Sequence, residues 1–172
     1  MEENKPKTGK YALNYGLLLG GIGVIFAFML YTADIHYKGG IAVMLISLAL
    51  TTAGIVLAML QFRKANEGFM SFSQALKVGV GVSLVAGIIG IIFNQILSNV
   101  IDPEMTAKAF EYQKNLMMET TSLTPEQIDA QIEMGKKWNT PLIQVAIGLI
   151  ASVFFGFIIS LISGLILKRQ EE

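Results

Sequence analysis

The stretch WNTPLIQVAIGLIASVFFGFIISLISGLIL, residues 138–167, decides the fold class of this 172-residue chain. It contains no Asp, Glu, Lys or Arg, and about 20 apolar residues already cross the ~30 Å hydrocarbon core of a bilayer at ~1.5 Å per residue. Three further charge-free stretches precede it, at residues 11–33, 39–62 and 78–101. All charged side chains lie outside these four stretches. We therefore predict an all-α membrane protein with four transmembrane helices.

The composition excludes a soluble globule, a nucleic-acid binder and a disulfide-rich secreted protein. Charged residues make up only 15% of the chain, against roughly 25% in a soluble domain. There is no cysteine and a single histidine, His36, which removes thiol catalysis, cysteine-ligated metals and most histidine-based sites. No phosphate-binding loop or nucleophile elbow occurs. We expect a non-enzymatic protein with no catalytic residue, no metal, no cofactor and no nucleic-acid partner.

The segments between the spans give the orientation, because Lys and Arg concentrate on the cytoplasmic side of membrane helices. With the N-terminus inside, the inner segments carry eight Lys and Arg residues and the outer segments five. This predicts cytoplasmic tails at residues 1–10 and 168–172 and a cytoplasmic link at residues 63–77. It leaves a tight outer turn at residues 34–38 and one sizeable outer segment, residues 102–137.

That outer segment is predicted to be an amphipathic hairpin of two short helices. Asp102-Pro103-Glu104 has an N-cap acid followed by proline at the first helical position. Thr124-Pro125-Glu126-Gln127 is a start signal of the capping-box type. One apolar face of the first helix is expected to comprise Met105, Ala109, Tyr112 and Leu116. The hairpin either lies on the membrane, covers the outer ends of the spans, or docks a periplasmic or membrane partner.

Small residues recur every four positions on two spans, a pattern that lets membrane helices approach closely. They are Gly148, Ser152, Gly156, Ser160 and Gly164 on span four, and Gly79, Ser83 and Gly87 on span three. Either these faces pack the helices of one chain together, or span four forms a contact with another chain. Besides the lipid bilayer, the partners considered are a homo-oligomer and another membrane protein. Under the second alternative, Gly156→Leu should dissociate an oligomer.

No ionisable residue lies well inside a predicted span, so a proton relay is not expected. The candidates for intramembrane polar contacts are uncharged: Asn94, Gln95 and Gln144. Asn94 and Gln95 face different directions on one helix, so we expect at most one of them to point into a shared pocket. Asp34 and His36 in the outer turn do not by themselves predict a metal site.

Three short motifs carry a resemblance to a known family. They are Ala12-x-x-x-Gly16, then Phe72-Ser73-Gln74-Ala75-Leu76-Lys77-x-Gly79, and then Ile101-Asp102-Pro103-Glu104. Together with the four spans, they resemble domain of unknown function 4199, a family of small multi-pass proteins of Gram-negative bacteria, over about residues 9–167. The resemblance implies a bacterial inner (cytoplasmic) membrane protein with a periplasmic hairpin. It implies no activity, cofactor or catalytic residue.

The leading functional hypothesis is therefore a non-enzymatic multi-pass inner-membrane protein that acts as a structural, scaffold or accessory subunit. The alternative is a small oligomeric channel or transporter for a neutral or weakly charged solute.

Overall fold

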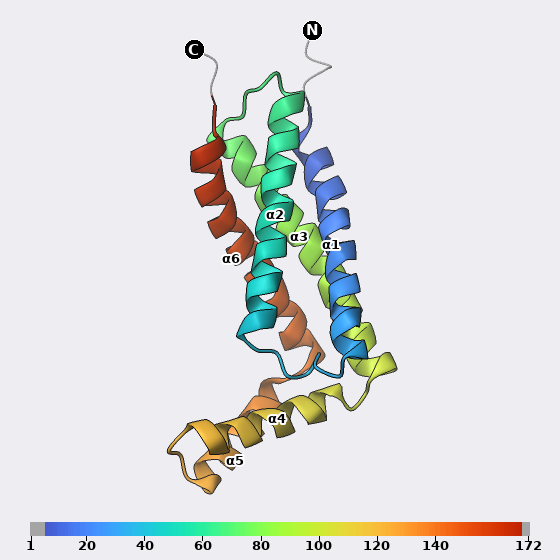
Figure 1. Cartoon of the computed structure of the whole chain (residues 1–172), viewed down its shortest axis with the longest axis vertical. Coiled ribbons are helices and arrows are strands. Elements are labelled where there is room, and N and C mark those ends of the chain that lie inside the picture. Colours follow the sequence, from blue (N-terminus) through green and yellow to red (C-terminus); the bar gives the residue numbers. More distant parts are fainter. Residues whose placement is uncertain (1–5, 170–172) are drawn as a thin grey trace.

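Four long helices form a bundle, and a hairpin of two shorter helices projects from one end of it (Figure 1). The computed structural model describes residues 6–169. The long helices are α1 (Thr8–Thr32), α2 (Ile41–Ala65), α3 (Phe72–Ile96) and α6 (Pro141–Leu167). Five π-helical residues, η1 (Leu97–Ile101), extend α3, and the hairpin comprises α4 (Met105–Thr120) and α5 (Pro125–Trp138).

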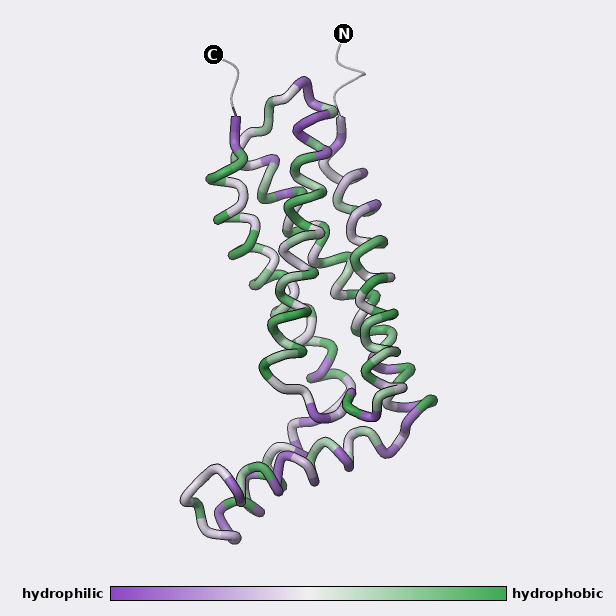
Figure 2. The backbone as a smooth tube through the Cα atoms, viewed as in Figure 1, coloured by the Kyte–Doolittle hydropathy of each residue, from purple (hydrophilic) through white to green (hydrophobic). Residues whose placement is uncertain are grey.

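The four long helices are each long and apolar enough to cross a membrane. Figure 2 shows hydrophobic residues along all four, with hydrophilic residues concentrated at the two ends of the bundle and along the hairpin. The protein is therefore membrane-embedded. The start of α1 and the end of α6 lie at one end of the bundle, which we call the terminal end, and the hairpin lies at the other, the hairpin end (Figure 1).

The buried core lies toward the terminal end and is built around α2 and α3. Tyr11 of α1 packs edge-on against the buried ring of Phe62, with the ring centroids 5.5 Å apart. The buried residues of the cluster are Leu19, Ile55, Ala58, Met59, Phe62, Met70, Ala75, Val78, Val82 and Ile159. All the buried residues of α2 fall between Ile55 and Phe62. The first nine residues of α2, at the hairpin end, are exposed except for the half-buried Val43.

The link between α2 and α3 is shorter than the predicted 63–77, because α2 runs to Ala65 and α3 begins at Phe72. A capping box explains the early start of α3. The backbone N–H of Gln74 donates to Ser71 Oγ at 3.2 Å, and the N–H of Ser71 donates to Gln74 Oε1 at 2.8 Å. These two bonds satisfy backbone donors that the first turn of a helix leaves unpaired. Lys77 therefore lies in the second turn of α3 instead of in a link.

Main-chain hydrogen bonds join this link to the segment that follows α6. The N–H of Met70 donates to the carbonyl of Arg169 at 2.8 Å, and the N–H of Arg169 donates back to the carbonyl of Met70 at 2.9 Å. Arg63 Nη1 also donates to the carbonyl of Leu167 at 3.2 Å. The terminal end of α6 is thus tied to both α2 and α3.

Of the two helix starts predicted in the hairpin, the second is confirmed and the first is wrong. Thr124 and Gln127 form a capping box before α5. Asp102 does not cap α4, which begins at Met105 with Glu104 at the N-cap and no side-chain cap. The reason is that the carboxylate of Asp102 is engaged elsewhere, as described next.

Candidate interaction site at the hairpin end

The small residues predicted on spans three and four face each other between α3 and α6 of the same chain. A Cβ on Gly79 would overlap Ser160, a Cβ on Gly156 would overlap Ser83, and one on Gly87 would lie 2.6 Å from Ser152 Cβ. Glycine therefore alternates with serine across the contact. The small residues at the two ends of the α6 series also face α3: Gly148 faces Ile91, and Gly164 faces Ala75. In this arrangement α3 occupies the small-residue face of α6.

Of the three predicted polar residues, two are hydrogen-bonded to each other and the third is not. Gln95 Nε2 of α3 donates to Gln144 Oε1 of α6 at 3.0 Å, whereas Asn94 is exposed. Gln144 Nε2 in turn donates to Asn139 Oδ1 at 2.6 Å, and Asn99 Nδ2 donates to Gln95 Oε1 at 3.2 Å. This amide chain fixes the connection between α5 and α6 to the end of α3.

A His–Asp–Lys cluster, which sequence reasoning missed, holds the start of the hairpin against the bundle. His36 Nε2 lies 3.0 Å from Asp102 Oδ2, and Lys108 Nζ donates to both oxygens of that carboxylate at 3.2 Å. The side chains of His36 and Asp102 are only 4% and 9% exposed. The ring of His36 is flanked edge-on by Tyr31 at 5.1 Å and Tyr37 at 5.4 Å between ring centroids. The cluster joins the turn after α1 to the connection between α3 and α4.

The electrostatics of this cluster favour its charged form. Burial would raise the pKa of Asp102, but the hydrogen bonds and charges of Lys108 and His36 outweigh it, so the pKa lies below its ordinary value. The hydrogen bond to Asp102 correspondingly raises the pKa of Lys108. The two side chains therefore hold each other in their charged forms, and the first turns of α4 are anchored by an ion pair.

The two helices of the hairpin pack against each other and leave several apolar side chains exposed. Ile128 and Ile132 of α5 are buried, and Phe110 of α4 packs where Gly135 leaves room, with its ring 3.1 Å from where a Cβ would stand. Lys114 and Asp129 form an ion pair between the two helices. The predicted apolar face of α4 is only partly engaged. Tyr112 is 37% exposed, and its ring lies edge-on to that of Tyr37, with the centroids 6.5 Å apart. Leu116 is 43% exposed, and Met118, Met134 and Trp138 are exposed as well.

The hairpin lies crosswise to the long axis of the bundle, beyond the ends of the long helices (Figure 1). We call the two points where the hairpin joins the bundle, before α4 and after α5, its roots. The His36–Asp102–Lys108 cluster holds the first root, and the amide chain through Gln144 holds the second. A helical pair that is fixed at both roots and exposes apolar and aromatic side chains is suited to holding a contact surface in one orientation.

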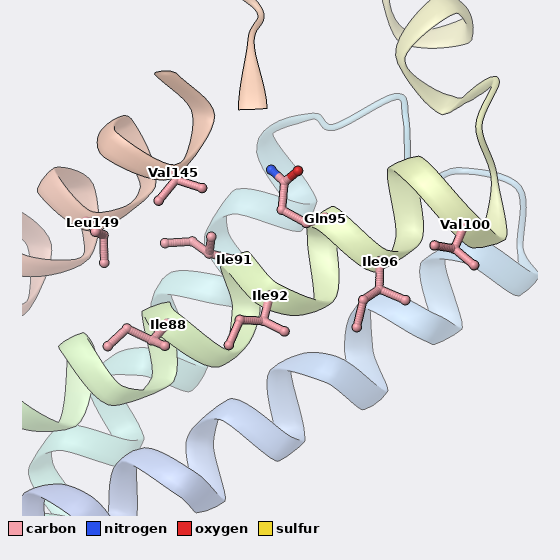
Figure 3. A pocket seen from close by; sticks show the side chains of 8 residues that line it. All are labelled: Ile88, Ile91, Ile92, Gln95, Ile96, Val100, Val145 and Leu149. Carbon is pink, nitrogen blue, oxygen red and sulfur yellow. The ribbon is translucent and has the colours of Figure 1, made fainter. Parts of the chain in front are cut away.

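A groove on the outside of α3 and α6 is almost entirely aliphatic. It has a volume of about 460 Å³ and is lined by Ile88, Ile91, Ile92, Gln95, Ile96, Val100, Val145 and Leu149. Figure 3 shows Gln95 as the one polar side chain among these aliphatic ones. Across residues 6–169 there is also no group of three or more His, Asp and Glu residues that could hold a metal ion. The hairpin is therefore the strongest candidate for a functional site.

A four-span, membrane-embedded bundle with a hairpin between its third and fourth spans defines the class of this protein. A family model described as "Protein of unknown function (DUF4199)" matches residues 14–169. The chain belongs to this family, which confirms the resemblance drawn from its motifs. Neither the curated proteins nor the solved structures contain a match to the chain.

Proposed function

We propose that this protein is a non-enzymatic accessory subunit that contacts another membrane protein through its hairpin. The observation that carries the proposal is the group of exposed apolar and aromatic side chains on a hairpin that is fixed to the bundle at both ends. Aromatic residues and methionine are enriched in protein interfaces, and Tyr112, Met118, Met134 and Trp138 are of these types. The small-residue packing of α3 against α6 gives this surface a firm support.

The proposed setting is the inner membrane of a Gram-negative bacterium, with both termini in the cytoplasm. The charges support this orientation, since the segments at the terminal end are richer in Lys and Arg than those at the hairpin end. The hairpin then faces the periplasm. It is also the more acidic side, with Glu and Asp outnumbering Lys along residues 102–137, so the partner surface is expected to be basic around an apolar centre.

The test is a pair of neighbouring substitutions on α4. Leu116→Asp replaces an exposed apolar side chain by a charge, whereas Asn115→Asp places the same charge on the adjacent exposed polar position. Affinity purification in mild detergent from the native host should yield a partner in constant stoichiometry with the unmodified chain and with Asn115→Asp, and lose it with Leu116→Asp. Recovery of the chain alone in every case, or equal recovery of the partner with both variants, would refute the proposal.

A second candidate is a small oligomeric channel or transporter for a neutral or weakly charged solute. One observation favours it: the amide chain Asn99–Gln95–Gln144–Asn139 supplies uncharged hydrogen-bonding groups at the hairpin end. Proteoliposomes would then show solute flux that Gln144→Leu reduces, and their impermeability to small neutral solutes would exclude this function.

A further inference from the structure

We propose that a half-open cavity bordered by α1, α2, α3 and α6 is a binding site for one hydrocarbon chain of a membrane lipid. Its volume is about 580 Å³, within the range of about 300–1,000 Å³ typical of ligand pockets. All four helices contribute to its lining, with side chains that include Phe26 of α1, Met44 and Leu48 of α2, Ala86 of α3 and Phe155 of α6.

The cavity exists because α2 is packed at one end only. Its buried residues lie at the terminal end, between Ile55 and Phe62, whereas the stretch that lines the cavity, Val43 to Thr51, has no buried residue. Glycines on the facing helices enlarge the space. A Cβ built on Gly23 of α1 or on Gly90 of α3 would meet nothing within 4 Å.

The lining selects an apolar occupant. It contains no charged residue, and most of its side chains are aliphatic or aromatic. Two of its four hydroxyl groups bond within their own helices: Thr51 Oγ1 donates to the carbonyl of Ser47 at 2.8 Å, and Ser152 Oγ donates to that of Leu149 at 2.9 Å. Ser83 Oγ is buried without a hydrogen-bond partner among the described residues. Since this part of α2 lies in a membrane-spanning segment and is exposed, the surrounding medium is lipid hydrocarbon.

The position of the cavity argues for a lipid chain as the occupant. Met44 and Leu48 of α2, which border it, are exposed in a membrane-spanning segment, so lipid hydrocarbon reaches its opening. A hydrocarbon chain is narrow and flexible enough to enter between helices. The lipid is expected to come from the leaflet nearer the hairpin end, since the α2 residues that line the cavity belong to the hairpin-end half of that helix.

Two glycines of α1 allow a matched test. Gly23→Leu extends a side chain into the cavity, whereas Gly21→Leu extends one from a glycine that does not line it, and neither Cβ meets an atom within 4 Å. The full chain is reconstituted in nanodiscs that contain a phosphatidylethanolamine with a photoreactive diazirine in one acyl chain. Adducts are mapped by mass spectrometry after irradiation. Gly90→Leu fills the cavity from α3 and serves as a second variant if Gly23→Leu does not fold.

We expect adducts to concentrate on the residues that line the cavity, to be lost in Gly23→Leu or Gly90→Leu, and to persist in Gly21→Leu. Adducts spread evenly over lining residues and bilayer-facing residues such as Ile162 would show annular lipid only and overturn the proposal. So would cavity adducts that survive both filling variants. Because the chain has no cysteine, Ser47→Cys gives a further check. Disulfide-linked dimers through this position would assign the cavity to a second copy.

Discussion

The packing of α3 against α6 makes a quantitative prediction at Gly87. The substitution Gly87→Ala adds a Cβ that would lie 2.6 Å from Ser152 Cβ and 2.8 Å from Ser152 Oγ. Carbon atoms in ordinary contact are about 3.5 Å apart, so the two helices must separate by about 0.9 Å at this level. Overpacking of this kind costs about 1–3 kcal/mol.

The matched control is Gly90→Ala, three residues further along the same helix, where an added Cβ meets nothing within 4 Å. Both substitutions gain the higher helix propensity of alanine, about 1 kcal/mol, so this contribution cancels in the comparison. Gly87→Ala should therefore be less stable than Gly90→Ala by about 1–3 kcal/mol. Ser152→Gly removes the atoms that clash with the new methyl group.

The assay is the free energy of unfolding in mixed detergent micelles, measured by titration with sodium dodecyl sulfate. In a double-mutant cycle, Ser152→Gly should rescue Gly87→Ala, with a coupling energy of about 1 kcal/mol or more. Equal stabilities of Gly87→Ala and Gly90→Ala, or the absence of coupling to Ser152, would refute the close packing of α3 on α6.

Three further predictions concern the two roots of the hairpin. Gln144→Leu removes the hydrogen bonds to Gln95 and Asn139 and should lower the free energy of unfolding by about 0.6–2 kcal/mol. An equal decrease in the free energy of unfolding with Asn94→Leu, at an exposed position, would contradict this prediction. His36→Leu should accelerate amide exchange in the first turns of α4, and the exposed Asp34→Asn should leave it unchanged. Since the folded-state pKa of Asp102 is lowered, its ion pair stabilises the hairpin above the ordinary pKa of 3.8 and is lost as the pH falls below that value. A spin-label distance between the hairpin and the bundle should therefore broaden only in that acidic range, and broadening that begins near neutral pH would contradict the role of Asp102.

The four spans could be predicted from sequence because the free energy of membrane insertion depends on the composition of one continuous segment. The pairing of helices could not. His36 and Asp102 are 66 residues apart, and only their shared position on the same side of the membrane hinted at a contact. Asp102 was assigned to a helix cap because Asp-Pro-Glu is a common cap pattern, whereas the structure directs its carboxylate to His36 and Lys108.

The sequence of α2 did not indicate that this helix is buried only toward the terminal end. In a soluble bundle, an exposed half-helix would carry polar residues, but in lipid an exposed and a buried apolar face have the same composition. The same argument explains why the small residues were informative. Close approach of two backbones requires glycine or serine whatever the solvent, so the stripe Gly148 to Gly164 marked a helix contact. Sequence alone left open that its partner is α3 of the same chain.

The two main-chain bonds between Met70 and Arg169 have a mechanical consequence. Met70 lies just before α3 and Arg169 just after α6, while the hairpin joins the same two helices at the other end. The chain thus forms a closed frame, with α3 and α6 as its long sides and the hairpin and the bridge as its ends. Moving the terminal ends of α3 and α6 apart therefore requires breaking both main-chain hydrogen bonds of the bridge.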